Sequence, residues 1–195
     1  MFRWILIAVF VSSISISAYY RRKARQSETI ARGEEGGLFI LLRLVFALPL
    51  FLSVLAYMIN PAWMDWSSAP VPTWLRWMGA VLGVAVVPLT YWVFRTIGRN
   101  ISETVLTKET HELVTDGPYR WVRHPLYVAG SLLFVTASLL AANWFIGGIT
   151  VVVIVMIVLV VIPKEEANLV ETFGEAYRAY MKRTGRLLPR LRAAE

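Results

Sequence analysis

Long apolar runs separated by short charged stretches are the feature of this sequence that most restricts its fold. The runs cover residues 2–20, 37–59, 75–94 and 126–162. Apolar residues make up 57% of the 195 positions and charged residues only 17%, a balance that is rare in a soluble domain. Because about 20 consecutive apolar residues cross a bilayer as a helix, the pattern predicts an all-α integral membrane helical bundle.

The last apolar run is too long for a single membrane helix. It is interrupted at residues 141–144, with sequence AANW, so two helices joined by a tight hairpin fit it better. We therefore expect about five transmembrane helices. After Pro163, apolar side chains recur at helical spacing in a polar context, which predicts a C-terminal amphipathic helix on the membrane or folded back onto the bundle. These side chains are Leu169, Val170, Phe173, Tyr177 and Tyr180.

The first run resembles a signal peptide in one respect, because small residues stand near its end. The sequence RRKAR follows at once, as expected for a retained membrane anchor. We therefore expect residues 1–94 to form three N-terminal transmembrane helices. Residues 95–195 should form a second region, made of a cytoplasmic loop, the helical hairpin and the C-terminal helix.

The basic residues concentrate on one side of this predicted bundle. With five spans, residues 21–36, 95–124 and 163–195 share one face and hold 17 of the 20 Lys and Arg residues. Since Lys and Arg are retained on the cytoplasmic side, we expect a multi-pass protein whose loop 95–124 and C-terminus are cytoplasmic. The formal net charge of +7 then reflects topology and contact with the anionic lipid bilayer, and not binding to nucleic acid.

Residue types that are missing exclude several kinds of site. The chain has no cysteine, which excludes disulfides, thiolate metal sites and thiol nucleophiles. Its glycines form neither a dinucleotide-binding nor a phosphate-binding motif. A metal site would have to combine His111 and His124 with a carboxylate of Glu112, Glu165 or Glu166, and nothing in their spacing supports this geometry. We therefore predict no bound metal.

Polar side chains gather where the final hairpin enters and leaves the membrane. GPYRWVRHPLYVAG precedes and opens its first helix, and PKEEANLVETFGEAY follows its second. Because a hairpin returns to the side that it left, Arg123, His124 and Tyr127 should lie near Glu165 and Glu166. The charges alone are equally compatible with headgroup anchoring plus an Arg–Glu pair that fixes the hairpin.

The order and spacing of these segments resemble the isoprenylcysteine carboxyl methyltransferase family. More broadly they resemble the integral-membrane methyltransferases that include phospholipid N-methyltransferases. The resemblance covers roughly residues 90–190 and rests on three motifs. They are an R-H-P-x-Y core, the preceding HELVTDGPY, and a double Glu followed by F-G-x-x-Y-x-x-Y. The core consists of Arg123, His124, Pro125 and Tyr127.

The resemblance implies a site for S-adenosyl-L-methionine, built from the loop before the fourth span, the hairpin mouth and the C-terminal helix. The R-H-P-x-Y side chains would line this pocket, and Tyr119 with the HELV segment would hold the adenosine. One Glu of the pair would meet the amino group or the ribose. The implied cofactor-binding residues are His111, Leu113, Val114, Tyr119, His124, Pro125, Tyr127, Glu165 and Glu166.

The resemblance also implies carboxyl O-methylation of a lipid-like or prenylated acceptor. Its G-R-x-x-P tail would close over the site, and Arg186 or Arg123 would orient the acceptor carboxylate. With Glu166 these are the catalytic candidates. A carboxylate is nucleophilic at neutral pH and needs only to be oriented.

Other functions remain open at this stage. An amine acceptor would arrive protonated and would need a base, for which Glu165, Glu166 or His124 is available. A phospholipid or small-amine N-methyltransferase is therefore one alternative. An NADPH-dependent sterol-reductase-like enzyme and a non-catalytic membrane protein are the others. The sequence predicts no particular oligomeric state.

Overall fold

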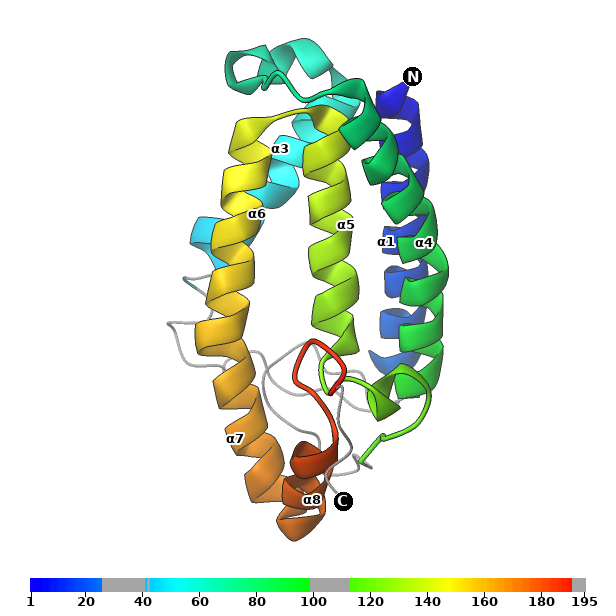
Figure 1. The fold of residues 1–195 in the computed structure, drawn as a ribbon, viewed down its shortest axis with the longest axis vertical. Coiled ribbons are helices and arrows are strands. Elements are labelled where there is room, and N and C mark those ends of the chain that lie inside the picture. Colours follow the sequence, from blue (N-terminus) through cyan, green and yellow to red (C-terminus); the bar gives the residue numbers. More distant parts are fainter. Residues whose placement is uncertain (26–40, 42, 99–112, 191–195) are drawn as a thin grey trace.

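The fold is a bundle of helices that run along the long axis of the molecule (Figure 1). The computed structural model describes residues 1–25, 41, 43–98 and 113–190. The helices are α1 (Phe2–Arg25), α3 (Leu48–Ile59), α4 (Thr73–Ile97), α5 (Pro125–Ala141), α6 (Trp144–Met156), α7 (Ile162–Phe173) and α8 (Glu175–Arg183). Short helical segments are η2 (Arg43–Ala47), η3 (Pro61–Ser67), η5 (Gly117–Arg120) and η6 (Ile157–Val161). The described residues contain two isolated β-bridges and no strand, which confirms the all-α prediction.

Within the described residues, three helices have the length and apolar character that crossing a membrane requires. They are Phe2–Ala24, Thr73–Ile97 and Trp144–Phe173. Leu44–Ile59 and Pro125–Ala141 are apolar but shorter. Each of the five overlaps a run that the sequence predicts to be a span. At 1.5 Å per residue the shorter ones reach about 25 Å, slightly less than the hydrocarbon core of a bilayer. The number of five crossings therefore stays a prediction.

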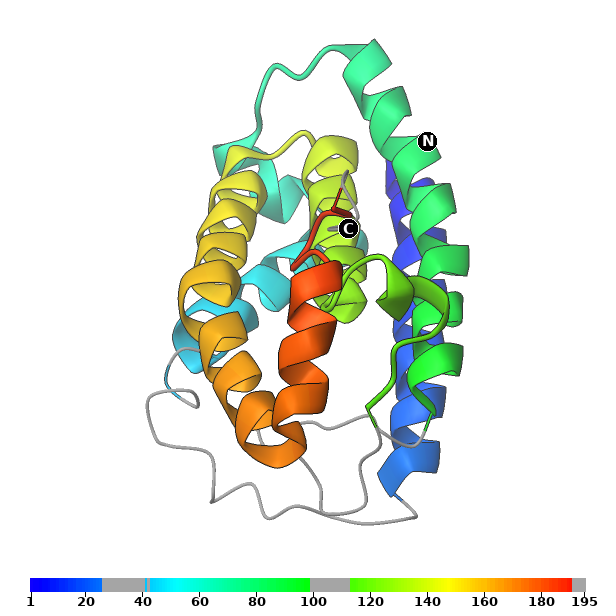
Figure 2. The same ribbon diagram turned by 60° about the horizontal axis from the view of Figure 1, so that its bottom comes forward.

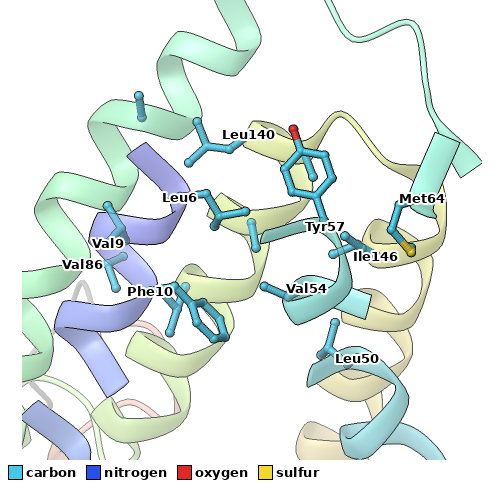
Figure 3. Packing of buried hydrophobic residues seen from close by; sticks show 14 residues of the cluster. Leu6, Val9, Phe10, Leu50, Val54, Tyr57, Met64, Val86, Leu140 and Ile146 are labelled. Carbon is cyan, nitrogen blue, oxygen red and sulfur yellow. The ribbon is translucent and has the colours of Figure 1, made fainter. Parts of the chain in front are cut away.

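One hydrophobic cluster joins five of the helices (Figure 3). Leu6 of α1, Val54 of α3, Val86 of α4, Leu140 of α5 and Ile146 of α6 are almost completely buried in it. In a membrane, such contacts stabilise a bundle mainly through close van der Waals packing. The cluster therefore fixes the α5–α6 hairpin at its turn and leaves the other end of the hairpin for polar contacts.

The turn between α5 and α6 is fastened to η3 by Asn143. The Asn143 Nδ2 donates to the Met64 carbonyl oxygen at 3.0 Å and to Ser67 Oγ at 2.8 Å. Its Oδ1 accepts from the Ile146 N–H at 3.0 Å, which caps the start of α6. The interruption predicted at residues 141–144 is thus confirmed as a hairpin turn.

Two glycines of α4 allow close contact with α5. A Cβ on Gly79 would lie 2.7 Å from Leu139 Cβ, and a Cβ on Gly83 would lie 2.8 Å from Thr136 Cγ2 and 3.1 Å from Val9 Cγ2. These distances are shorter than van der Waals contact, so only glycine fits. The G-x-x-x-G pattern of α4 serves packing within the bundle.

We predict that Gly83→Ala lowers the thermal stability of the detergent-purified protein. The added methyl group would overlap the Thr136 side chain, and overpacking of this kind costs about 1–3 kcal/mol. Gly148→Ala is the matched control, because a Cβ there meets no atom within 4 Å. It should leave the melting temperature unchanged or raise it slightly. Equal melting temperatures for both variants would contradict the packing described for α4.

The segment after Pro163 differs from the expected single helix. α6, η6 and α7 form one continuous helix, and η6 contains a π-type bond from the Ile162 N–H to the Ile157 carbonyl. A proline ring collides with the carbonyl four residues earlier in a regular helix, and the wider π turn relieves this collision. The helix ends at Gly174, whose φ is +55°, and α8 then runs back beside α7 (Figure 2). Tyr177 and Tyr180 consequently lie on a separate helix.

Candidate active site

The site lies where the chain enters α5, and η5 is positioned there by a glycine. Gly117 has a φ of +55°, and a Cβ on it would lie 2.7 Å from Thr96 Oγ1 at the end of α4. This close approach docks η5 against α4. α5 then begins at Pro125, where a missing N–H costs little. The residue before it, His124, is therefore held at the mouth of the hairpin.

The C-terminal tail pairs with the segment that enters α5. The Arg123 N–H donates to the Gly185 carbonyl at 2.8 Å, and the His124 N–H donates to the Arg186 carbonyl at 3.2 Å. A Cβ on Gly185 would overlap the Leu188 carbonyl oxygen. The tail can therefore follow this path only with glycine at position 185, and the pairing brings Arg186 to the site.

The Glu166 carboxylate is the centre of the cluster. Its Oε1 accepts from Arg123 Nε at 2.8 Å, forms an ion pair with Arg123 Nη2 at 2.8 Å and lies 3.3 Å from His124 Nε2. Its Oε2 accepts from Arg186 Nη2 at 2.8 Å. The side chain is only 5% exposed. A buried carboxylate is stable only when it is paired and hydrogen-bonded, and Glu166 satisfies both conditions.

Arg123 uses nearly all of its hydrogen-bond donors within the protein. Besides the two bonds to Glu166, its Nη1 donates to the carbonyl oxygens of Met181 and Thr184. The side chain is 7% exposed. Arg123 therefore ties the entry to α5 to α7 and to the end of α8, and little of its side chain is accessible to an acceptor.

Glu165 has a different environment, although it is the next residue on α7. Its Oε2 accepts from the Tyr127 hydroxyl at 2.8 Å and lies 3.8 Å from His124 Nδ1. The side chain is 29% exposed. No arginine pairs with it among the described residues, so Glu165 keeps a partly accessible negative charge.

Arg186 is the more accessible of the two arginines at Glu166. Its side chain is 43% exposed, and the one hydrogen bond found for it in the described part of the chain joins Nη2 to Glu166. A guanidinium has five N–H donors. Arg186 therefore presents several donors at the surface of the site.

Three tyrosines pack on the inner side of α8. The Tyr180 hydroxyl donates to the Tyr119 carbonyl oxygen at 2.5 Å, and the Tyr177 and Tyr180 rings lie 5.8 Å apart. The hydroxyls of Tyr119 and Tyr177 are buried and have no hydrogen-bond partner among the residues that the structure describes. Burial, followed by the charge of Glu165, raises the pKa of Tyr119 far above its usual range. Burial also raises the pKa of Tyr180 to about 12, so these side chains remain neutral phenols.

The structure brings together the side chains that the hairpin topology predicts to meet. Arg123, His124 and Tyr127 contact the Glu165–Glu166 pair, and Tyr119 packs beside them. Other candidates differ in position. Pro125 is buried at the start of α5, Leu113 and Val114 are half-buried in the segment before η5, and His111 lies outside the described residues. The roles of all these residues stay predictions.

Two features of the site were not predicted from the sequence. Arg123 is held by the backbone carbonyls of Met181 and Thr184, and Tyr177 is buried with an unpaired hydroxyl. Every residue has a backbone carbonyl, so the sequence does not show which carbonyl oxygens will accept a hydrogen bond. Tyr177 did have a signal, because a tyrosine on the apolar face of an amphipathic helix carries a polar group into the interior.

The described residues also contain no group of three His, Cys, Asp or Glu side chains that could hold a metal ion. The two glutamates contact His124, Arg123, Arg186 and Tyr127. The fold and the cluster together define the class of the protein. It is a helical membrane protein with a polar, charge-paired site at the mouth of its last hairpin.

Known proteins of one family are similar to part of this chain. Residues 79–171 match the model of the isoprenylcysteine carboxyl methyltransferase family. The protein-S-isoprenylcysteine O-methyltransferase of Mus musculus is 30% identical over 126 residues, which cover 64% of this chain and 44% of that protein. The methanethiol S-methyltransferase of Pseudomonas deceptionensis is 36% identical over 74 residues, which cover 38% of this chain and 27% of that protein. The chain thus spans less than half of these relatives.

A solved structure supports the fold. The chain is similar to the structure of the eukaryotic intramembrane Ras methyltransferase, an isoprenylcysteine carboxyl methyltransferase, with a TM-score of 0.56 and 20% identity. The match covers 98% of this chain and 70% of the chain in that structure. The matched segment, residues 79–171, covers a little under half of the chain and is similar to the isoprenylcysteine carboxyl methyltransferase family. The resemblance and the membrane helical bundle predicted from the sequence are confirmed.

We predict that Glu166→Gln strongly destabilises the protein. Removing one partner of a buried ion pair leaves uncompensated charge, at a cost of about 3–5 kcal/mol, and here two guanidiniums lose their counter-ion. Glu175→Gln is the matched control, because Glu175 pairs with Arg178 on α8 and its side chain is 90% exposed. Thermal unfolding should show a large loss for the first variant and almost none for the second. Equal losses would mean that the Glu166 cluster does not stabilise the fold.

Proposed function

We propose that this protein is a membrane methyltransferase that uses S-adenosyl-L-methionine and methylates the carboxylate of a lipid-like or prenylated acceptor. The proposal rests on one observation, which is that some charged side chains at the hairpin mouth are buried and paired and others are partly exposed. Glu166 and Arg123 neutralise each other in the interior, whereas Glu165 and Arg186 are partly exposed. The site therefore offers one accessible anion and one accessible cation.

The residues present fit the proposed cofactor. It has an ammonium group, a carboxylate and ribose hydroxyls. Glu165 suits the ammonium group, and the unpaired hydroxyls of Tyr119 and Tyr177 suit neutral polar groups. When bound, S-adenosyl-L-methionine supplies an electrophilic methyl group on a positively charged sulfur. The rings of Tyr127 and His124, whose centroids lie 5.8 Å apart, would help to exclude water from this region.

Glu165→Gln should weaken binding of S-adenosylhomocysteine. A charge-assisted hydrogen bond contributes about 1.5–3 kcal/mol, so the dissociation constant should rise about tenfold or more. Methylthioadenosine lacks the amino acid part and should bind both proteins equally. Calorimetry on detergent-purified protein measures both constants, with Glu175→Gln as the control. If Glu165→Gln weakens both ligands alike, or neither, Glu165 does not bind the ammonium group.

Arg186 is proposed to orient the acceptor carboxylate. Both arginines are candidates from the sequence, but the Arg123 side chain is buried and most of its donors are occupied within the protein. Arg186 has exposed donors in the planar arrangement that matches a carboxylate. A bound carboxylate needs no general base. Its charge is lost on methylation, so a site with little water favours transfer.

Arg186→Gln should raise the KM for a synthetic S-prenylated cysteine about tenfold or more, from the loss of a charge-assisted hydrogen bond. The affinity for S-adenosylhomocysteine should change little. Arg178→Gln, on the exposed face of α8, is the control. With a radiolabelled methyl donor, the product should release its label as methanol in mild base, as an ester does.

The acceptor assay needs three further substrates. The carboxamide of the same prenylated cysteine should not be methylated, nor should an amine. A small thiol is included because one relative is named a methanethiol S-methyltransferase. Base-stable label on an amine or a thiol, with no ester formed, would overturn the proposed acceptor chemistry.

The location of the site on the cytoplasmic side is part of the proposal. The Lys and Arg distribution supports it, and a soluble cofactor would then reach the site directly. Division of the chain at residue 94, into membrane helices and a cofactor-binding region, is likewise proposed. That nucleic acid is not a partner of this protein also stays a prediction.

A further inference from the structure

Six of the eight tryptophans of the sequence lie at the end of the bundle opposite to the candidate active site. α1, α4 and α6 begin at this end, where η3 lies, and α8 lies at the other end (Figure 1). The six side chains are between 46% and 66% exposed, so packing within the bundle does not explain them. They are Trp4 of α1, Trp63 and Trp66 of η3, Trp74 and Trp77 of α4, and Trp144 of α6.

In each of these three helices, an exposed tryptophan continues an exposed apolar face. Trp4, Trp74 and Trp144 each precede an exposed valine by seven residues, which is about two turns and therefore the same face. The valines are Val11, Val81 and Val151, which are 51%, 71% and 60% exposed. Among the described residues these three helices are the ones long and apolar enough to cross a membrane. The tryptophans thus stand where the surface that suits lipid chains ends.

η3 brings two more exposed indoles to the start of α6. The Trp66 ring lies 5.7 Å from the Trp144 ring and 5.1 Å from the Phe145 ring. The hydrogen bonds of Asn143 to the Met64 carbonyl oxygen and to Ser67 fasten η3 in this place. The fold therefore holds the tryptophans of η3 at the same end as those of the three helices.

The arginines at this end have backbone partners and no carboxylate partner in the part of the chain that the structure describes. Arg3 Nε donates to the Met58 carbonyl oxygen at 2.9 Å, and Arg3 Nη2 donates to that of Ile59 at 2.6 Å. Arg76 Nη2 donates to the Leu140 carbonyl oxygen at 2.6 Å. These bonds satisfy carbonyl groups at the ends of α3 and α5. They leave the positive charge of both guanidiniums uncompensated, and a phosphate group suits such a charge.

We propose that this tryptophan-rich end binds the phospholipid headgroup layer of the leaflet opposite to the candidate active site. Indole combines an apolar ring with one N–H donor and concentrates at membrane–water interfaces. Tryptophans on four elements at one end of the bundle match a lipid layer, whereas a protein partner would need them on one side of it. Asp65 is the one acidic side chain that the described residues place there, against Arg3 and Arg76. The charge balance therefore favours lipid phosphate.

The length of α4 agrees with this placement. Its 25 residues span about 37 Å, which exceeds the hydrocarbon core of a bilayer at about 30 Å. With Trp74 in one headgroup layer, Trp92 lies about 27 Å further along the helix, close to the other layer. The Trp92 ring lies 5.4 Å from that of Trp121, and both are partly exposed. The contact of the tryptophan-rich end with lipid thus fixes how deep the whole bundle lies.

Tryptophan fluorescence of the full chain in phosphatidylcholine vesicles tests the proposal. The protein should lose more fluorescence to lipid brominated close to the headgroups than to lipid brominated close to the bilayer centre. Iodide in the water should quench little. The double variant Trp92→Phe and Trp121→Phe keeps only the six tryptophans of this end and should give the same order of quenching.

Spin labels provide a second measurement that does not depend on removing several tryptophans. The chain has no cysteine, so a single one can be labelled at a chosen position. A nitroxide at Trp74→Cys should lie at headgroup depth, and one at Val81→Cys should lie about 10 Å deeper. A nitroxide at Trp63→Cys should lie at the depth of the first. Relative access to oxygen and to a water-soluble nickel complex measures these depths.

Three results would overturn the inference. Strong quenching by iodide with none by brominated lipid would place this end in water. Protection from both quenchers would mean that a protein surface, such as a second copy of the chain, covers the tryptophans. Strongest quenching from the bilayer centre would place this end within the hydrocarbon core. All three are independent of methyl transfer, so they leave the proposed function unaffected.

Discussion

The pairing of the buried Glu166 carboxylate with Arg123 and Arg186 is the interaction on which the site depends. A carboxylate or a guanidinium that is buried alone costs several kcal/mol. The entry to α5, the start of α7 and the C-terminal tail must therefore come together for each charge to be compensated. Arg123 extends the network to the end of α8 through two carbonyl oxygens. One ion cluster thus closes the end of the bundle that the hydrophobic core does not reach.

Because the Glu166 cluster closes this end of the bundle, the two glutamates differ in exposure, and so do the two arginines. Glu166 and Arg123 form a buried ion pair, whereas Glu165 and Arg186 remain partly exposed. Consecutive residues of an α-helix point about 100° apart, so only one glutamate of the pair can face the arginines. The other stays at the edge of the site, where it keeps its charge for a ligand.

Much of the architecture follows from the sequence. Apolar runs give the membrane helices, and the AANW interruption gives the hairpin that brings Arg123 and His124 to the two glutamates. The sequence does not reveal which glutamate faces Arg123, because the π turn η6 adds a residue before Pro163 and so rotates everything after it. The pairing of the tail with positions 123 and 124 is formed by backbone groups, which residue types do not encode.

The most direct test of this account is an experimental structure of the protein with S-adenosylhomocysteine. The account predicts that the ligand lies among η5, α7 and α8, with the ammonium group of its amino acid part at Glu165, while the Arg123–Glu166 pair stays intact. A nucleoside bound elsewhere on the bundle, or a broken Arg123–Glu166 pair in the complex, would contradict it.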